Sequence, residues 1–313
     1  MRKTCLNMVH KLSTTDDRVV FIGSDLSPGL LDEMKLEKPK HHYMEGIAEA
    51  HVIGMAAGMA MDGLIPYVNT ISTFITRRCF EQVAVDLCLH NLPVKLIGNG
   101  GGLVYAPLGP THLAIEDFAI MRSLPNMTVV AVSDAQEMIR LMQVSIDWPY
   151  PMYIRLGKGG DPVISLDTDN FQIGKAILRK EAEAEYQVLL ISTGVMTGRA
   201  LDAACLLEEQ GVGCKVLHMH TIKPYDEQGL TEAAHNARLI VTIEEHVING
   251  GLGSATAEII SDSNQSFSPL LRLALPDQFP SDYGRQENLL DLYKLNPVEL
   301  TKSITKRLAT LNN

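Results

Sequence analysis

An acidic side chain, Glu49, stands at the start of an otherwise apolar helical segment, and its placement suggests chemistry. The segment 46–63 reads GIAEAHVIGMAAGMAMDG, so scarcely a charge separates Glu49 from Asp62. A helix this apolar is expected to be buried, and its glycines let other backbones come close. The helix dipole favours a carboxylate in the first turn, whereas desolvation favours a protonated acid. Glu49 is therefore either a helix-capping residue or a proton donor to a molecule bound in the cleft.

The elements that must hold Glu49 in place are apolar runs that alternate with helical patterns, which is typical of parallel strands joined by crossover helices. In the first half, strands are predicted over 18–23, 64–70, 94–99, 127–133 and 151–160, and helices from Ile47 and over 73–90, 115–124 and 135–146. In the second half, strands are predicted over 187–193, 212–220, 238–245 and 270–275, and helices over 196–210, 226–236, from Gly251 and over 296–308. Asp134 is predicted to cap the helix that follows it.

A polar stretch from about residue 161 to 186 separates the two halves. We therefore expect an α/β protein with two open, mostly parallel sheets and flanking helices, divided into domains over 1–180 and 181–313. Ligands in such sheets bind at the carboxyl ends of the strands. Glu49 lies at a helix start, where that rule places a binding site.

Composition narrows the class of protein. Of the 313 residues 46% are hydrophobic and 20% charged, which fits a globular protein with a sizeable core. The net charge of −10 and the lack of Lys/Arg runs argue against nucleic acid or an anionic membrane surface as a partner. No window approaches the roughly 20 consecutive apolar residues of a spanning helix, and the N-terminus is not a secretory signal. The five cysteines form no CxxC pair or metal-like cluster, which favours reduced thiols in a cytoplasmic protein.

Three segments resemble the thiamine-diphosphate enzymes of the transketolase group, in the right order and at the right spacing: GIAEAH (46–51), STFITRRCFEQ (72–82) and LGPTHLAIEDFAIMRSLPNMTVV (108–130). The match is to the pyrimidine-binding and C-terminal domains of transketolase, deoxyxylulose-phosphate synthase and the beta subunits of 2-oxoacid dehydrogenases. It runs from about residue 18 to the end, and includes IKPYDEQGL (222–230) and EEHVINGGLGSA (244–255). The GPTH segment points to transketolase more than to the dehydrogenases. The resemblance implies a pyrimidine-binding domain over 1–180 and a transketolase C-terminal domain over 181–313.

The resemblance also implies roles for the residues that bind the cofactor. Glu49 matches the acid that protonates a pyrimidine ring nitrogen of thiamine diphosphate, and Phe74 matches the aromatic residue that stacks on that ring. Phe80 is a second stacking candidate, although the core or the cleft wall is its favoured place. Asp25 keeps the acidic position of the family's ADL turn. Phe74 as a core residue is the alternative.

Three further residues are candidates for substrate binding. His112 matches a histidine that lines the substrate channel and can shuttle a proton during carbon–carbon cleavage. Its alternative is a helix-start histidine that is satisfied by the backbone. Arg78 and Lys158 are basic candidates for an anionic substrate, and Lys158 stands where phosphate-using relatives carry an arginine. Either could instead be a solvated surface charge.

Two departures from the transketolase pattern bear on the substrate. Leu108 stands where transketolases usually have an aspartate that reads substrate hydroxyls, and Gly29 replaces a serine that helps to hold the phosphate. A sugar phosphate thereby loses two polar partners. The substrates are therefore expected to be smaller, less hydroxylated or unphosphorylated.

The sequence contains no GDG motif, through which the family holds Mg²⁺ and the diphosphate in a separate domain. No metal ligands are therefore assigned to this chain. We expect a split enzyme in which a second polypeptide, an N-terminal transketolase-like subunit, carries the Mg²⁺ site. The two kinds of chain are expected to form a heterotetramer with two-fold symmetry. This chain would be the C-terminal subunit of a transferase that moves a two-carbon ketol-type unit from a ketose or 2-oxo donor to an aldehyde.

Three alternatives stay open at this point. A carboligase of the deoxyxylulose-phosphate synthase type and a 2-oxoacid dehydrogenase beta subunit are the enzymatic ones. The third is a non-catalytic homologue that keeps the fold as a scaffold, and Leu108 and Gly29 support it. Retention of Glu49, Phe74 and His112 together argues against a scaffold, which has no physical need for that combination.

Overall fold

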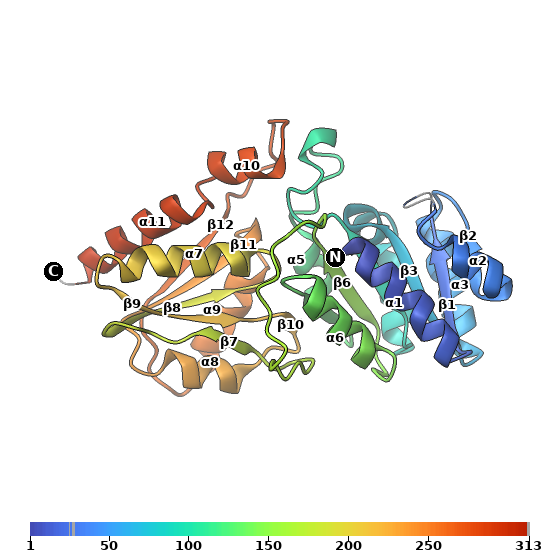
Figure 1. The fold of residues 1–313 in the computed structure, drawn as a ribbon, viewed down its shortest axis with the longest axis horizontal. Coiled ribbons are helices and arrows are strands. Elements are labelled where there is room, and N and C mark those ends of the chain that lie inside the picture. The colour runs from blue at the N-terminus through green and yellow to red at the C-terminus, as the bar shows by residue number, and fades with distance from the viewer. Residues whose placement is uncertain (25, 27–28, 312–313) are drawn as a thin grey trace.

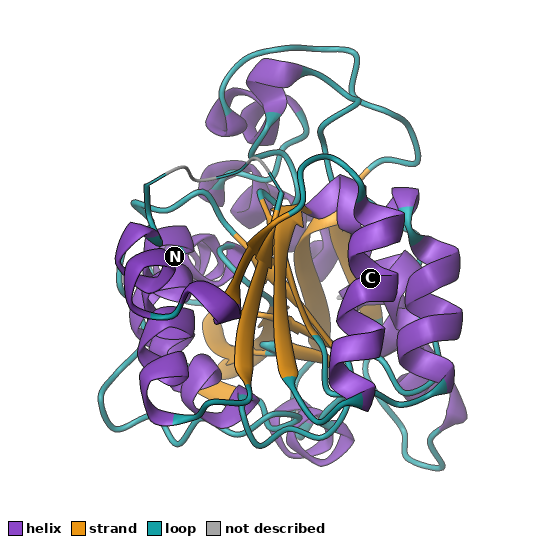
Figure 2. Ribbon diagram, turned by 90° about the vertical axis from the view of Figure 1, so that its right-hand side faces the viewer, coloured by secondary structure: helices purple, strands orange, loops and turns teal. Residues whose placement is uncertain are grey.

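The computed structural model describes residues 1–24, 26 and 29–311, and it divides their strands between a seven-stranded and a five-stranded sheet. The two sheets form two lobes that lie side by side, with the N-terminal half in one and the C-terminal half in the other (Figure 1). Helices cover both faces of the sheets (Figure 2). The predicted fold class, α/β with two mostly parallel sheets, is confirmed.

The first sheet has the strand order β10-β5-β6-β4-β3-β1-β2. Its strands are β1 (Val19–Gly23), β2 (His42–Met44), β3 (Ile65–Ile71), β4 (Lys95–Asn99), β5 (Thr128–Ala131), β6 (Met152–Leu156) and β10 (Thr221–Lys223). All of these strands run parallel to their neighbours except β10, which is antiparallel to β5. The central strands β3, β4 and β6 are buried along their whole length, which explains why they read as continuous apolar runs.

The helices of this half are α1 (Arg2–Thr15), α2 (Asp32–Glu37), α3 (Glu49–Met61), α4 (Phe80–Gln82), α5 (Asp117–Arg122) and α6 (Ala135–Ser145). The short turns are η1 (Pro39–His41) and η4 (Ala106–Leu108), which are 3₁₀ helices, and η2 (Phe74–Arg78) and η3 (Val83–Leu89), which are π-helices. Asp134 caps α6 as predicted, because its side chain accepts hydrogen bonds from the backbone N–H groups of Gln136 and Glu137.

The second sheet has the order β12-β11-β8-β9-β7. Its strands are β7 (Ile177–Lys180), β8 (Tyr186–Ser192), β9 (Gly213–His218), β11 (Leu239–Val247) and β12 (Leu270–Leu275). Its helices are α7 (Met196–Glu208), α8 (Glu227–Ala234), α9 (Leu252–Asp262), α10 (Gln286–Leu292) and α11 (Pro297–Thr310). Only β7 in this sheet runs antiparallel to its neighbour.

Two strands depart from a simple division of the chain at residue 180. Strand β7 ends at Lys180 but pairs with β9 in the second sheet. Strand β10 follows β9 in the chain but crosses to pair with β5 in the first sheet. The position of the domain boundary stays a prediction, and these pairings show that the two halves share strands.

The N-terminal helix α1 was not expected from the sequence. Its buried residues Cys5, Leu6 and Val9 recur at helical spacing and belong to one core cluster with Leu141 of α6. No helix among the described residues is long and apolar enough to cross a membrane.

Candidate functional site

Glu49 begins helix α3, just after the turn that leaves strand β2. Gly46 in that turn has a φ of +72°, a left-handed conformation that glycine adopts at little cost. Only 4% of Glu49 is exposed. The residue lines a small cavity of about 10 Å³ with Asn69 and Thr70, near the carboxyl end of β3. Glu49 therefore lies at the edge of the sheet where parallel α/β folds bind their ligands.

The guanidinium of Arg78 contacts both Glu49 and Phe74. Its Nη1 donates to the two carboxylate oxygens of Glu49 at 3.2 and 3.0 Å. Its Cζ lies 4.0 Å from the centroid of the Phe74 ring. The Arg78 side chain is 45% exposed, whereas the Glu49 side chain is 4% exposed. One half-exposed guanidinium thus joins two of the predicted cofactor-binding residues.

Phe74 and Arg78 lie four residues apart, a spacing that puts two side chains on one face of a helix, although the segment 73–90 is not the single regular helix that its pattern predicts. It forms the two π-helices η2 and η3 on either side of the short α4. Phe74 and Arg78 are the first and last residues of η2. A π-helix bonds each N–H five residues back instead of four, and such turns inside helices are frequent at functional sites.

The next residue, Cys79, is buried beside this cluster. Burial, followed by the charge of Glu49, raises the pKa of its thiol to about 12. Cys79 therefore stays a neutral thiol at physiological pH and is a poor nucleophile.

His112 reaches the cluster from the loop between β4 and α5. Its ring centroid lies 5.3 Å from that of Phe74, with the ring planes at 65°. The loop turns at Gly109, where φ is +80° and an added Cβ would lie 2.6 Å from the ring of Tyr283. Tyr283 precedes α10, and this part of the second lobe rises beside the loop that carries η4 (Figure 1). The structure therefore brings Glu49, Phe74, Arg78 and His112 together.

Arg77 is a residue of this site that the sequence reasoning missed. Its Nη1 lies 3.1 Å from Glu116 Oε1, and its Nη2 donates to the backbone carbonyls of Thr111 and Leu113 at 3.4 Å. These carbonyls flank His112, so Arg77 helps to position the loop that carries it. Burial raises the pKa of Glu116, and the charge of Arg77 opposes that rise. The signal available was its neighbour: Arg78, the second member of the arginine pair, was already a substrate-binding candidate.

Asn69 and Asn99 were also missed, although both stand at the ends of predicted strands. Asn99 Nδ2 donates to Asn69 Oδ1 at 2.6 Å and to the carbonyl of Thr70 at 3.0 Å. The Nδ2 of Asn69 has no hydrogen-bond partner among the residues that the structure describes. An unpaired buried donor is costly, and this one belongs to a residue that lines the Glu49 cavity. Polar residues at the carboxyl ends of neighbouring buried strands were the signal available.

The remaining predicted residues lie apart from this cluster or outside the described residues. Phe80 is 36% exposed on α4, and Lys158 is exposed in the turn after β6. Across the described ranges no hydrogen bond, ion pair or ring contact connects either to Glu49 or Phe74. Asp25 falls outside the described residues. The roles assigned to all seven residues stay predictions.

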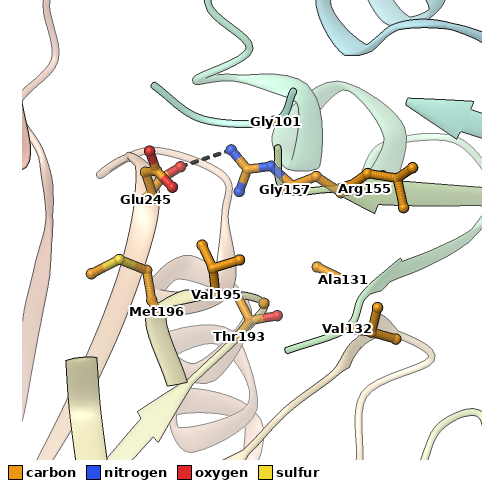
Figure 3. A pocket seen from close by; sticks show the side chains of 11 residues that line it. Gly101, Ala131, Val132, Arg155, Gly157, Thr193, Val195, Met196 and Glu245 are labelled. Atoms are coloured by element: carbon orange, nitrogen blue, oxygen red, sulfur yellow. Dashed lines mark hydrogen bonds between the residues drawn. The ribbon is translucent and has the colours of Figure 1, made fainter. Parts of the chain in front are cut away.

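A second small cavity, of about 20 Å³, lies between the two lobes (Figure 3). Arg155 at the end of β6 faces Glu245 of β11 across it, and Arg155 Nη2 donates to the Glu245 carbonyl at 2.8 Å. The Nε of Arg155 also lies 3.1 Å from Asp117 Oδ2, and its guanidinium covers the Phe118 ring at 4.1 Å. The Glu245 carboxylate accepts hydrogen bonds from Gln286 and from the backbone of Leu103. These interactions join the lobes.

A buried contact between an acid and a histidine lies elsewhere on the same interface. Glu137 of α6 and His218 of β9 meet at 2.9 Å, and their side chains are 1% and 0% exposed. His218 Nδ1 lies 2.7 Å from Thr197 Oγ1, which in turn accepts from Ser192 at 3.0 Å. Burial raises the pKa of Glu137, but the charge and hydrogen bond of His218 outweigh it and lower the pKa to about 2. The acid–histidine–hydroxyl order resembles a nucleophilic triad, yet its members are sealed from solvent.

The comparisons with known proteins agree with this geometry. One family model, the pyrimidine binding domain of transketolase, matches residues 1–160, and a second, the transketolase C-terminal domain, matches residues 174–300. The chain belongs to the transketolase family. The predicted resemblance is thereby confirmed.

Two curated relatives in the transketolase family differ in how much of them this chain covers. The 6-deoxy-6-sulfo-D-fructose transketolase subunit SqwH of Clostridium sp. strain MSTE9 is 33% identical over 97% of this chain and 92% of its own length. The 1-deoxy-D-xylulose-5-phosphate synthase of Parasynechococcus marenigrum strain WH8102 is 34% identical over 95% of this chain. The chain spans only 46% of that synthase, so it corresponds to about half of such an enzyme.

Solved transketolase structures likewise differ in how much of them this chain covers. A chain described as a split gene transketolase in an inactive beta4 tetramer matches with a TM-score of 0.89 and 32% identity, covering 98% of both chains. The transketolase of Campylobacter jejuni matches with a TM-score of 0.79 at 17% identity, and 46% of it is covered. The second match shows the shared fold.

Membership in the transketolase family implies thiamine diphosphate as cofactor. The residues present suit its pyrimidine ring: a buried carboxyl group, an aromatic ring, and the unpaired Nδ2 of Asn69 among the described residues. Among those residues no group of three or more His, Cys, Asp or Glu side chains is placed to hold a metal ion.

Proposed function

We propose that this chain is the pyrimidine-binding subunit of a thiamine-diphosphate-dependent transketolase-like transferase. The enzyme would move a two-carbon ketol-type unit from a ketose or 2-oxo donor to an aldehyde. The observation that carries the proposal is the meeting of Glu49, Phe74 and His112 at the ligand-binding edge of the first sheet. The cofactor, when bound, supplies a carbon centre that stabilises a carbanion.

The chain's own residues would act on the cofactor and the substrate in different ways. Glu49 would hold a proton at a pyrimidine ring nitrogen. Because the residue is only 4% exposed, water scarcely competes with that nitrogen for its hydrogen bond. Phe74 would stack on the ring and exclude water from it. His112, next to Phe74, would hydrogen-bond substrate oxygens and move a proton between them.

We propose further that a second polypeptide holds Mg²⁺ and the diphosphate, and that the two chains assemble into a heterotetramer. Two names support a divided enzyme: a relative is called a transketolase subunit, and a neighbour is called a split gene transketolase. Both are covered over nearly their whole length by this chain. The five cysteines are all free thiols, which supports a reducing compartment such as the cytoplasm.

The substrate would carry fewer hydroxyl groups than a pentose phosphate. Leu108, which replaces the expected aspartate, is 51% exposed just before the loop that carries His112. An exposed leucine there offers no hydrogen bond to a sugar hydroxyl. Asp25, Phe80 and Lys158 keep their proposed parts in cofactor and substrate binding.

A synthase that condenses a decarboxylated 2-oxo acid with an aldehyde is the second candidate, since synthases of this kind match at 34% identity. Donor assays separate the two. Formation of carbon dioxide from pyruvate favours the synthase, whereas cleavage of a ketose without carbon dioxide favours the transferase.

The first experiment is calorimetric titration of thiamine diphosphate and Mg²⁺ into this chain, alone and mixed with a GDG-containing partner subunit. We expect binding only in the mixture, with loss in Glu49→Ala and Phe74→Ala. Glu33→Ala is the control for loss of a carboxylate, because the Glu33 side chain is exposed on α2. Absence of binding in the mixture would overturn the enzymatic proposal, and tight binding to the isolated chain would overturn the divided site.

A further inference from the structure

The side chain of Arg78 occupies both of the groups that the proposed function assigns to the cofactor ring. Its Nη1 is hydrogen-bonded to both oxygens of Glu49, at 3.2 and 3.0 Å. Its guanidinium plane covers the ring of Phe74, with Cζ 4.0 Å from the centroid. A flat, cationic, hydrogen-bonding group therefore lies on the same two surfaces that a protonated pyrimidine would need.

These two sets of contacts exclude each other. A pyrimidine that stacks on the face of Phe74 covered by the guanidinium would have to lie where the guanidinium now lies, because both groups pack at van der Waals distance. A ring nitrogen that bonds to Glu49 must likewise replace at least one of the two Nη1 hydrogen bonds. We propose that Arg78 is an internal competitor that holds the site closed to the aromatic ring until its guanidinium moves away. This inference rests on the proposed function.

The competing groups Phe74 and Arg78 belong to one helical turn. They are the first and last residues of η2, and residues four apart lie on the same face of a helix. The contact is therefore local to one turn and needs no movement of the sheet or of α3. Movement of one side chain about its rotatable bonds suffices to open the site.

The Arg78 contacts are also the kind that can open. Its side chain is 45% exposed, so a displaced guanidinium is readily hydrated. Arg155, by contrast, is 9% exposed and bonds to Asp117 and to two backbone carbonyls. Arg155 has no solvent into which its guanidinium can move, whereas the guanidinium of Arg78 can move into water.

The test is the affinity of the assembled complex for thiamine diphosphate and, in parallel, for thiamine, which lacks the diphosphate. Calorimetry measures binding without any requirement for activity. We expect Arg78→Ala to bind both ligands about tenfold more tightly, because the fraction of chains with an open site rises. Arg78→Lys keeps the charge but not the flat guanidinium, so its affinity should fall between those of the wild type and Arg78→Ala.

Thiamine separates the competition from simple charge attraction. If Arg78 instead helped to bind the diphosphate, Arg78→Ala would weaken thiamine diphosphate and leave thiamine unchanged, and the proposal would be overturned. Unchanged affinity for both ligands would overturn it too. Arg18→Ala is the matched control, because it removes an arginine from an exposed pair with Asp16 and should leave both affinities as they are.

The outcomes also distinguish this inference from the proposed function. If the wild-type complex binds the cofactor in a Glu49-dependent way but Arg78→Ala brings no gain, only the competition is wrong. If no variant of the complex binds either ligand, the proposed function fails and this inference fails with it.

Discussion

The cluster around Glu49 and the interface between the lobes use the same kinds of side chain for opposite purposes. Each combines a buried acid, a base and an aromatic ring. At the interface, Glu137 and His218 are 1% and 0% exposed, and their polar partners continue into Thr197. At the edge of the first sheet, Glu49 is equally buried but its partner Arg78 is 45% exposed. Exposure of the base, rather than the types of residue, separates an exchangeable site from a fixed one.

The difference between the two sites follows from the access of each base to water. A buried base that loses its acid has no water to replace it, so breaking such a pair is strongly unfavourable. A half-exposed arginine exchanges its acid for water at small cost. A triad-like order of groups, such as that of Glu137, His218 and Thr197, therefore does not by itself indicate catalysis.

Removal of the base at the interface should destabilise the fold more than any other change proposed here. We expect His218→Ala to lower the free energy of unfolding by about 3–5 kcal/mol, because it leaves the Glu137 carboxylate buried without its partner. Urea denaturation followed by circular dichroism measures this. His235→Ala, at an exposed histidine, is the control and should change stability by less than about 0.5 kcal/mol. Equal effects of the two variants would show that the interface pair is not a stabilising contact.

Acid should weaken the interface pair only as the pH falls toward the low pKa of Glu137. The pKa of Glu137 lies near 2 in the folded chain, below its ordinary value of 4.5, so the unfolded chain binds more protons between these values. The stabilisation is complete above about pH 4.5 and is lost as the pH falls toward 2. The expected loss is of the order of 3 kcal/mol.

The contribution of Glu137 can be isolated by comparison with Glu137→Gln. The pKa of His220, which burial lowers to about 4, and that of Glu244, which burial raises to about 7, also make stability depend on pH. The Glu244 contribution is common to the two proteins and cancels in the difference. The charge of Glu137 opposes the lowering of the His220 pKa, so the difference also contains the response of His220 near pH 4. Parallel stability curves for wild type and variant between pH 5 and 2 would contradict the assignment.

At the exchangeable site, loss of charge should affect binding more than folding. Glu49→Gln keeps the size and the hydrogen-bonding capacity of the side chain, and it leaves Arg78 able to turn to water. We expect its stability to change by at most about 1 kcal/mol, whereas affinity of the complex for thiamine diphosphate falls about 100-fold, near 2.7 kcal/mol. Thermal unfolding and calorimetry test the two halves. A large stability loss with intact binding would show that Glu49 is a structural residue and not a cofactor-binding one.

The smallest expected effect lies on the helix that carries Glu49. Gly58 in α3 has no atom within 4 Å of an added Cβ and no left-handed φ. Gly58→Ala should therefore stabilise the chain by about 0.5–1 kcal/mol. Gly109→Ala is the contrasting variant, because its φ is +80° and its Cβ would meet Tyr283 at 2.6 Å. Destabilisation by Gly58→Ala would mean that α3 is less regular than described.

Most of the fold was predictable because buried parallel strands leave long apolar runs. The strands predicted at 64–70 and 94–99 coincide within a residue with β3 and β4. The three-residue strand β10 could not be found, because its pairing with β5 depends on the other lobe. The buried residues of α1 recur at helical spacing, so the sequence carries a signal for this helix too.

The site was predictable in its residues but not in its connections. Motifs identified Glu49, Phe74, Arg78 and His112, which the fold brings together. The π-helical turn from Phe74 to Arg78 has no distinct apolar period, so the sequence predicts an ordinary helix there. The bond between Asn69 and Asn99 required the register of β3 on β4, which local patterns do not specify.

Strand β10 has a consequence for how the chain is made. It covers the outer side of β5, and it lies about 90 residues further along the chain than its partner. During synthesis, the first lobe leaves the ribosome with that edge unpaired and waits for Thr221–Lys223 to emerge. An open edge is a template for pairing with other chains, so truncation before residue 221 should give a first lobe prone to aggregation. The second half of the chain thus supplies the strand that covers the open edge of the first sheet, and it does so only after that strand has been synthesised.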